Sequence, residues 1–108
     1  MIQCVLWIIY ALDKPGAAAI RTATREAHLA YLDEHAAAVM LGGALLADDS
    51  PERLGSCLIV NLPDRAAAER WAENEPFNRA GLFASVTIAR MRKGQFNPGA
   101  APRTAEGE

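Results

Sequence analysis

Residues 2–12, IQCVLWIIYAL, constrain the fold more than any other stretch of the chain. They are rich in the β-branched and aromatic residues that favour strands, and both alternating sets are apolar: Cys4, Leu6 and Ile8 on one side and Val5, Trp7 and Ile9 on the other. Neighbouring side chains of a strand point to opposite faces of a sheet. A strand that is apolar on both sides must therefore be covered on both sides.

Turn residues and periodic segments divide the rest of the chain. A polar turn precedes an alanine-rich segment that predicts a long helix over residues 17–39, and Asp64 predicts the N-cap of a second helix that runs to Asn74. The residue before a proline is pushed out of the helical region, so Pro76 ends this helix and holds Glu75 at its end. Three further strands are predicted, at residues 40–47, 56–62 and 83–91.

The resulting order, β-α-β-β-α-β, is that of the ferredoxin-like α+β sandwich. Its two helices can cover only one face of the sheet. Because the first strand is apolar on both sides, the other face would be an exposed apolar patch of the kind that marks an interface. We therefore expect a homodimer in which two sheets pack against each other.

Length and composition bound the class of protein. The chain has 108 residues, which predicts one compact domain over residues 1–96 and a flexible tail over residues 97–108 that is rich in Gly, Pro and Ala. A net charge of -2 without a basic run lacks the electrostatic footprint of a nucleic-acid-binding protein. The longest apolar stretch is too short to span a bilayer and follows no basic residue, so we expect neither a membrane helix nor a signal peptide, and a cytoplasmic protein.

The thiol and imidazole groups predict no disulfide framework and no metal site. Cys4 and Cys57 fall in predicted strands, where a cysteine usually behaves as a small buried hydrophobe. His28 and His35 share one stripe of the long helix. The helix between them separates them by roughly 10 Å, which is too far to bind one metal ion.

The segment 21–32, RTATREAHLAYL, carries the candidate chemistry. At about 100° per residue, His28 and Tyr31 lie inside the apolar arc of the helix. The opposite side gathers polar residues: Thr22, Glu26 and Asp33. An inward-pointing imidazole needs partners for its ring nitrogens or a cavity to face. A hydrogen-bonded core histidine is the commoner outcome, and an acid–base or binding role is the alternative.

Five other residues are candidates for contact with a small ligand. Arg25, one turn before the histidine, either binds an oxyanion or pairs with a surface acid. Tyr31 and Phe77 either line a pocket for a ring-bearing ligand or belong to the core, as aromatic residues at such positions more often do. Gly43 and Ser56 offer backbone and hydroxyl donors; the alternatives are a close sheet contact and a strand start, and for Ser56 the structural alternative is favoured.

Four short motifs, taken in their order and spacing, resemble those of a known family. They are RxxH at residues 25–28 continued by LAYL, the glycine pair at 42–43 followed by Ala-Leu, the Gly-Ser pair at 55–56, and EPF followed by AGLF within residues 75–83. Over nearly all of residues 1–96 the chain resembles the YCII-related domain family, the YciI-like proteins.

The resemblance implies a dimeric α/β barrel of ferredoxin-like subunits, each with a pocket that holds a catalytic His–Asp pair. The histidine corresponds to His28. The family's acid is usually an aspartate directly before a proline and an aromatic residue, and Glu75 stands at that position, before Pro76 and Phe77. Glutamate keeps the charge and reaches one methylene further. The family also often has a proline where this chain has Ala44.

The first functional hypothesis is an enzyme of proton-transfer or elimination type that acts on a small, aromatic or oxygenated compound without a cofactor. A carboxylate that accepts from one imidazole nitrogen fixes the tautomer and leaves the other nitrogen to exchange protons with a ligand. In this hypothesis His28 transfers the proton, Glu75 orients it and Arg25 balances negative charge. The resemblance supplies the reaction class, because family members are linked to dehydrochlorination of a chlorinated hydroxyhydroquinone.

Two other classes stay open at this point. One is a non-catalytic dimeric module that captures a metabolite in the same pocket. The other is a related dimeric barrel of the heme-degrading or quinone-forming monooxygenase type, which shares the topology and lacks these motifs.

Overall fold

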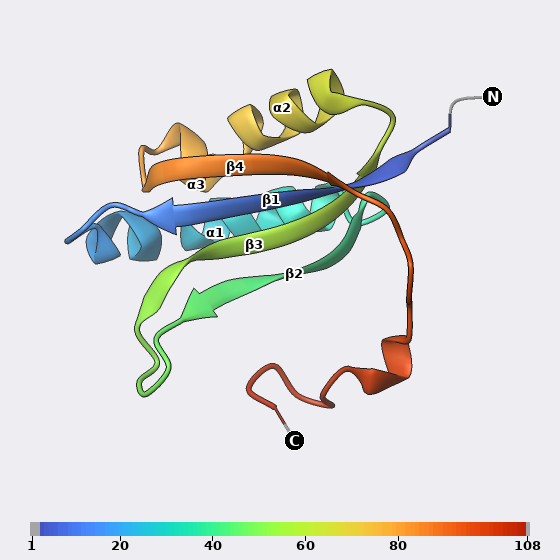
Figure 1. The fold of residues 1–108 in the computed structure, drawn as a ribbon. Helices are drawn as coiled ribbons and strands as arrows, with labels where there is room; N and C mark the ends of the chain where they lie inside the picture. Colours follow the sequence, from blue (N-terminus) through green and yellow to red (C-terminus); the bar gives the residue numbers. More distant parts are fainter. Residues whose placement is uncertain (1–2, 108) are drawn as a thin grey trace.

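The computed structural model describes residues 3–107 and shows an α+β fold built on one four-stranded antiparallel sheet. The main elements are β1 (Val5–Asp13), α1 (Ala18–Glu34), β2 (Val39–Leu46), β3 (Arg53–Leu62), α2 (Arg65–Asn74), α3 (Pro76–Arg79) and β4 (Phe83–Met91). The strand order β2-β3-β1-β4 places β1 inside the sheet, between β3 and β4 (Figure 1). The predicted β-α-β-β-α-β order is confirmed, with the short helix α3 added after α2.

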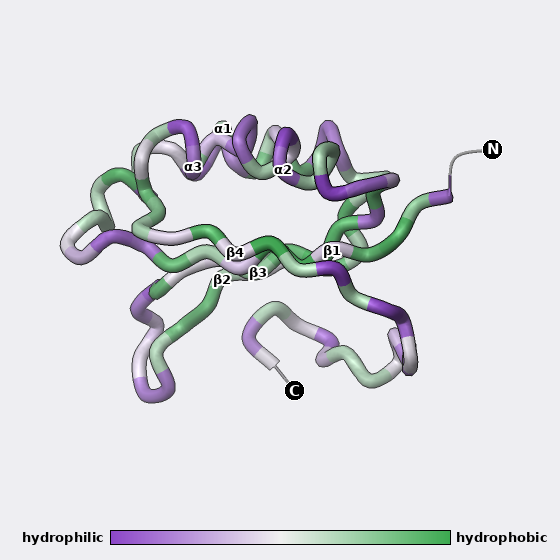
Figure 2. The backbone as a smooth tube through the Cα atoms, turned by 45° about the horizontal axis from the view of Figure 1, so that its top comes forward, coloured by the Kyte–Doolittle hydropathy of each residue, from purple (hydrophilic) through white to green (hydrophobic). Residues whose placement is uncertain are grey.

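The three helices lie on one face of the sheet, and the C-terminal segment lies on the other side (Figure 2). The main core fills the space between the sheet and the helices. Its buried side chains are Trp7, Ile9, Leu58, Val60, Ala68, Trp71 and Ala72. The prediction that the helices cover a single face is therefore confirmed.

Two element boundaries differ from the prediction for visible reasons. Helix α1 ends at Glu34 rather than at residue 39, because the chain turns and Val39 already pairs with Val60 in the sheet. Strand β3 begins at Arg53, earlier than predicted, because Arg53 already pairs with Leu46 of β2. Helical propensity alone could not place the first boundary, since tertiary pairing overrides it.

The predicted N-cap of α2 is confirmed, and the expected burial of Cys4 before β1 is wrong. The backbone amide of Ala67 donates to Oδ1 of Asp64 at 2.8 Å, so the predicted N-cap is confirmed. Cys4 is exposed rather than buried, because the ladder between β1 and β3 begins at Val5 and Leu62. Cys57 is partly buried in β3.

Some predictions concern the ends of the chain. Residues 1 and 2 belong to the predicted domain, residue 2 also to the predicted first strand, and residue 108 to the predicted tail. All three lie outside the described residues. In the tail, residues 98–100 form a single 3₁₀ turn, and its flexibility stays a prediction. Within residues 3–107 no helix has the length and hydropathy needed to cross a membrane.

Three glycines in the sheet differ in the space around them. A Cβ atom added to Gly55 would overlap the backbone carbonyl oxygen of Ala11 on the neighbouring strand. A Cβ atom on Gly42 would overlap Cδ2 of Leu58, which is the end of a flexible side chain. A Cβ atom on Gly43 would meet no atom within 4 Å. The strands β1 and β3 therefore approach each other at Gly55 as closely as a missing side chain allows.

Candidate active site

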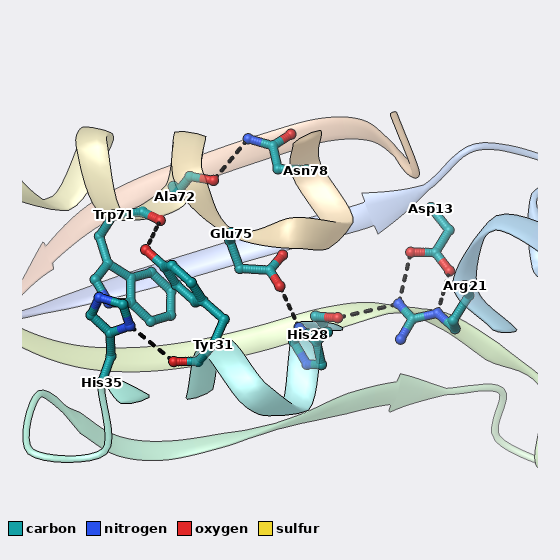
Figure 3. A network of polar contacts seen from close by, with 10 residues as sticks. Asp13, Arg21, His28, Tyr31, His35, Trp71, Ala72, Glu75 and Asn78 are labelled. Atoms are coloured by element: carbon teal, nitrogen blue, oxygen red, sulfur yellow. Dashed lines mark hydrogen bonds and ion pairs between the residues drawn. The ribbon is translucent and has the colours of Figure 1, made fainter. Parts of the chain in front are cut away.

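His28 and Glu75 lie side by side, although they come from different helical segments. Nδ1 of His28, on α1, contacts Oε1 of Glu75, which sits between the end of α2 and the start of α3 (Figure 3). Only 12% of the His28 side chain and 3% of the Glu75 side chain are exposed. Pro76 begins α3 and leaves Glu75 extended, with φ −66° and ψ 128°, so the carboxylate is held on rigid backbone.

The ring of Phe77 packs against one face of the His28 imidazole. Its ring stacks on the His28 ring with 4.0 Å between centroids and an interplanar angle of 14°. The guanidinium carbon of Arg21 lies 4.6 Å from the centroid of the same Phe77 ring. Phe77 is 1% exposed, so this contact with a cation is largely desolvated. The predicted pocket aromatic therefore fixes the plane of the histidine ring.

Arg21 belongs to the segment predicted to carry the chemistry, but it was not among the predicted site residues. Its Nε and Nη2 donate to the two carboxylate oxygens of Asp13, each at 2.9 Å, and Nη2 also donates to the hydroxyl oxygen of Ser56 at 3.2 Å. Arg21 is buried, at 8% exposure. A buried guanidinium is tolerated because this planar pairing satisfies it. Arg21 occupies the same helical stripe as His28, and that spacing was the signal available in the sequence.

A cavity of about 540 Å³ opens beside His28, between α1 and the paired strands β2 and β3. Four of the predicted ligand contacts line it: Arg25, Gly43, Ser56 and Phe77. Its volume lies within the range of small-molecule pockets. Ser56 lies inside β3, which begins at Arg53, so the expected strand start is wrong. Its hydroxyl accepts from Arg21 in the cavity wall.

Tyr31 lies away from this cavity, in the layer between α1 and α2. Its hydroxyl donates to the backbone carbonyl of Trp71 at 2.9 Å, and its ring meets the Trp71 ring edge-on. Contact of Tyr31 with a ligand stays a prediction. Burial raises the pKa of Tyr31 above its ordinary value of 10.0, and the negative charges of Glu75 and Glu34 raise it further.

The raised pKa of Tyr31 predicts a loss of stability at alkaline pH. The unfolded chain releases the Tyr31 proton at a lower pH than the folded chain, so the stabilisation is complete below the ordinary pKa of 10.0 and is lost as pH rises through the folded value. Tyr31→Phe should therefore flatten the fall in unfolding free energy above about pH 10. Urea denaturation across this range measures it, and an unchanged slope in Tyr31→Phe would contradict the prediction.

Two other features bear on the choice of site. A hollow of about 610 Å³ at the other end of the sheet, beside Asn61 and Arg90, contains none of the predicted site residues. Within residues 3–107, no group of three or more His, Cys, Asp or Glu side chains is arranged to hold a metal ion. His28 thus lines the cavity, and its partner Glu75 lies behind it, outside the cavity lining.

Comparison with known proteins places this geometry in a family. The model of the YCII-related domain matches residues 5–92. The chain belongs to the YCII-related domain family. Protein YciI of Escherichia coli O6:H1 is 30% identical to it over 96 residues, which cover 82% of this chain and 98% of that protein. An uncharacterized protein of Haemophilus influenzae is 32% identical over 94 residues, covering 81% of this chain and 96% of that protein.

One solved structure links this YCII-related fold to a reaction. It is the 5-chloro-2-hydroxyhydroquinone dehydrochlorinase of Burkholderia phenoliruptrix AC1100, in complex with 2,5-dihydroxybenzoquinone. It shares 34% identity with this chain, covers 82% of this chain and 95% of its own, and superposes with a TM-score of 0.78. The ferredoxin-like α+β fold of the YCII-related chain is thereby supported, and this neighbour binds a small ring ligand.

Proposed function

We propose that this chain is an enzyme that catalyses proton transfer or elimination on a small, ring-bearing, oxygenated compound without a cofactor. The single observation that carries the proposal is the contact between Nδ1 of His28 and Glu75 at the wall of the cavity. A neutral imidazole that donates its Nδ1 proton to a carboxylate keeps the lone pair of Nε2 for a ligand. His28 is thus equipped as a general base and, once protonated, as a general acid.

The surrounding side chains suit this role. Phe77 stacks on the imidazole and limits its rotation, and Glu75 fixes its tautomer, so both are positioning residues. Arg25 lines the cavity one helical turn before His28, where its guanidinium can balance an ionised oxygen of the substrate.

The dehydrochlorinase neighbour supports the elimination form of the proposal. In a chlorinated hydroxyhydroquinone, His28 would move a proton from a ring hydroxyl to the carbon that carries chlorine. Chloride then leaves with the bonding electron pair, a second hydroxyl proton is lost, and the ring becomes a hydroxyquinone. The net change is loss of one proton and one chloride ion, so the step needs no oxidant and no cofactor.

Release of chloride from 5-chloro-2-hydroxyhydroquinone is the direct test. The purified chain is incubated with this compound without oxygen, and free chloride and quinone absorbance are followed against a protein-free control. Enzyme-dependent release of both in equal amounts supports the proposal. Tight binding across a series of chlorinated and hydroxylated phenols, with no turnover of any of them, would instead establish the non-catalytic binding module.

We also propose that the working form is a homodimer. Its two subunits would be joined through the open face of the sheet, which is the face that the helices do not cover. Tyr10, Leu12 and Leu41 are large apolar residues on the strands of this sheet, and each is at least 40% exposed. Tyr10 and Leu12 lie on the interior strand β1, and Leu41 lies on the edge strand β2. Exposed large apolar residues gathered on one face of a sheet are typical of an interface.

A charge on the open face should separate such a dimer. Leu41 is 60% exposed, so Leu41→Glu should cost the monomer little while placing an unpaired carboxylate in the interface. Leu29→Glu, on the helical side at 43% exposure, is the matched control. Sedimentation equilibrium should show a monomer for the first variant and a dimer for the control and the wild type. A wild-type monomer at all concentrations would contradict the proposal.

A further inference from the structure

The cavity beside His28 is strongly basic in a chain whose net charge is -2. Three arginines line it, Arg21 and Arg25 from α1 and Arg53 from β3. The described residues of its lining include no aspartate or glutamate. Charges of one sign in a concave site raise the local concentration of ligands of the opposite sign.

Only two of the three guanidinium groups are available to a ligand. Arg21 is held by both carboxylate oxygens of Asp13, so its charge is neutralised inside the wall. Arg25 and Arg53 form no ion pair with any residue in the range 3–107. Arg53 makes one weak contact, from Nη1 to the carbonyl oxygen of Pro51 at 3.3 Å. The cavity therefore keeps two uncompensated positive charges.

The two free arginines stand on different walls. Arg25 lies on α1, one turn before His28, whereas Arg53 begins β3 and also lines an adjoining hollow of about 460 Å³. A ligand that presents one ionised oxygen to Arg25 leaves Arg53 unpaired. A ligand with a second ionised oxygen across its ring offers one partner to each arginine, and a guanidinium binds such planar oxygen groups well.

We propose that the ligand class of this site is a single-ring compound with two ionised oxygens, and that Arg53 is the residue that selects the second one. The inference rests on the proposed function, in which Arg25 takes the oxygen nearest the reacting atoms. It adds a specificity residue that the predicted site did not include. In this proposal Arg53 determines which ligands bind, and His28 transfers the protons.

A pair of matched probes tests the role of Arg53. The first is 2,5-dihydroxybenzoquinone, which has two acidic hydroxyls, and the second is its monomethyl ether, which has one. Titration calorimetry near neutral pH should show that the wild type binds the first more tightly. Arg53→Gln should weaken binding of the first about tenfold and of the ether about twofold or less, since it removes one charge-assisted contact.

Two further variants separate a contact from a general electrostatic effect. Arg53→Lys should keep part of the preference, because it keeps the charge and loses the planar fork. Arg70→Gln removes an exposed arginine from α2, outside the cavity, and should leave the binding of both probes unchanged. The preference of the wild type should also shrink as salt is raised, because exposed charges are screened.

Three results would overturn the inference: equal weakening of both probes by Arg53→Gln, no weakening of either, or a wild type without preference for the doubly ionised probe. These are binding measurements and need no turnover. A chain that releases chloride but shows any of these results would refute the role of Arg53 alone. A chain without turnover that shows the selective loss would refute the proposed function alone.

Discussion

His28→Asn is expected to lower kcat for the proposed elimination by about a hundredfold to ten-thousandfold, the usual contribution of a positioned general acid–base group. Asparagine keeps a polar side chain of similar reach and cannot accept and return a proton near neutral pH. Because the cavity wall stays in place, binding of 2,5-dihydroxybenzoquinone should change far less than kcat. Chloride release at saturating substrate measures the first quantity, and calorimetry measures the second.

The second histidine of the same helix supplies the control for this experiment. His35 bonds to the backbone carbonyl of Tyr31 and does not line the cavity, so His35→Asn should keep wild-type kcat. In His28→Asn the carboxylate of Glu75, 3% exposed, loses the imidazole that it contacts, which lowers stability. The double variant His28→Asn, Glu75→Gln removes that buried charge and should recover folding without activity. Full turnover in either folded variant would end the proposed mechanism.

Glu75 is expected to act through His28, and its variants can show this. Glu75→Gln should lower kcat less than His28→Asn does and should also change the pH–rate profile, because the group that orients the imidazole loses its charge. Glu75→Asp keeps the carboxylate charge and shortens its reach by one methylene. It should recover part of the activity, whereas a purely structural role would leave the pH profile unchanged in both variants.

Gly55→Ala is expected to be the most destabilising single-methyl change in the sheet, at about 3 kcal/mol or more. The added Cβ would overlap the Ala11 carbonyl oxygen, and both atoms belong to paired backbone that cannot rotate away. Relief of the overlap requires β1 and β3 to separate where Leu12 pairs with Gly55. Urea denaturation measures the loss as a lower midpoint at constant slope.

Two other glycines make this a graded series. Gly42→Ala would overlap only the tip of the Leu58 side chain, so a rotamer change relieves it and the cost should be smaller. Gly43→Ala meets open space and should be neutral or slightly stabilising, because alanine restricts the unfolded chain. An equal loss of stability in all three variants would show that backbone contact at Gly55 is not the cause.

Much of the fold could be predicted because its signals are local. The β-branched and aromatic residues of β1 predicted a strand, and Asp64 and Pro76 marked both ends of α2. The end of α1 could not be predicted the same way. Residues 36–38 are alanines, the best helix formers, and pairing of the next residues with β3 ends the helix.

The site also has parts that local sequence signals predict and parts that they do not. Pro76 predicted that Glu75 is held at a helix end, and the structure brings it to His28. The pairing of Arg21 with Asp13 was not predicted, because an arginine in an amphipathic helix is usually solvated. Its burial depends on the turn that brings the end of β1 back against α1. Such long-range placement is not encoded in helical periodicity.

The two strands that line the cavity differ in the space they leave for a new side chain, and this difference affects how such a protein can evolve. On β3, Gly55 and Ser56 are fixed by the neighbouring strand and by Arg21, so new side chains there would damage the fold. On the edge strand β2, Gly43 has open space, and a larger residue could be accommodated without loss of stability. Divergence in substrate range should therefore accumulate along β2, where the cavity can be reshaped one side chain at a time.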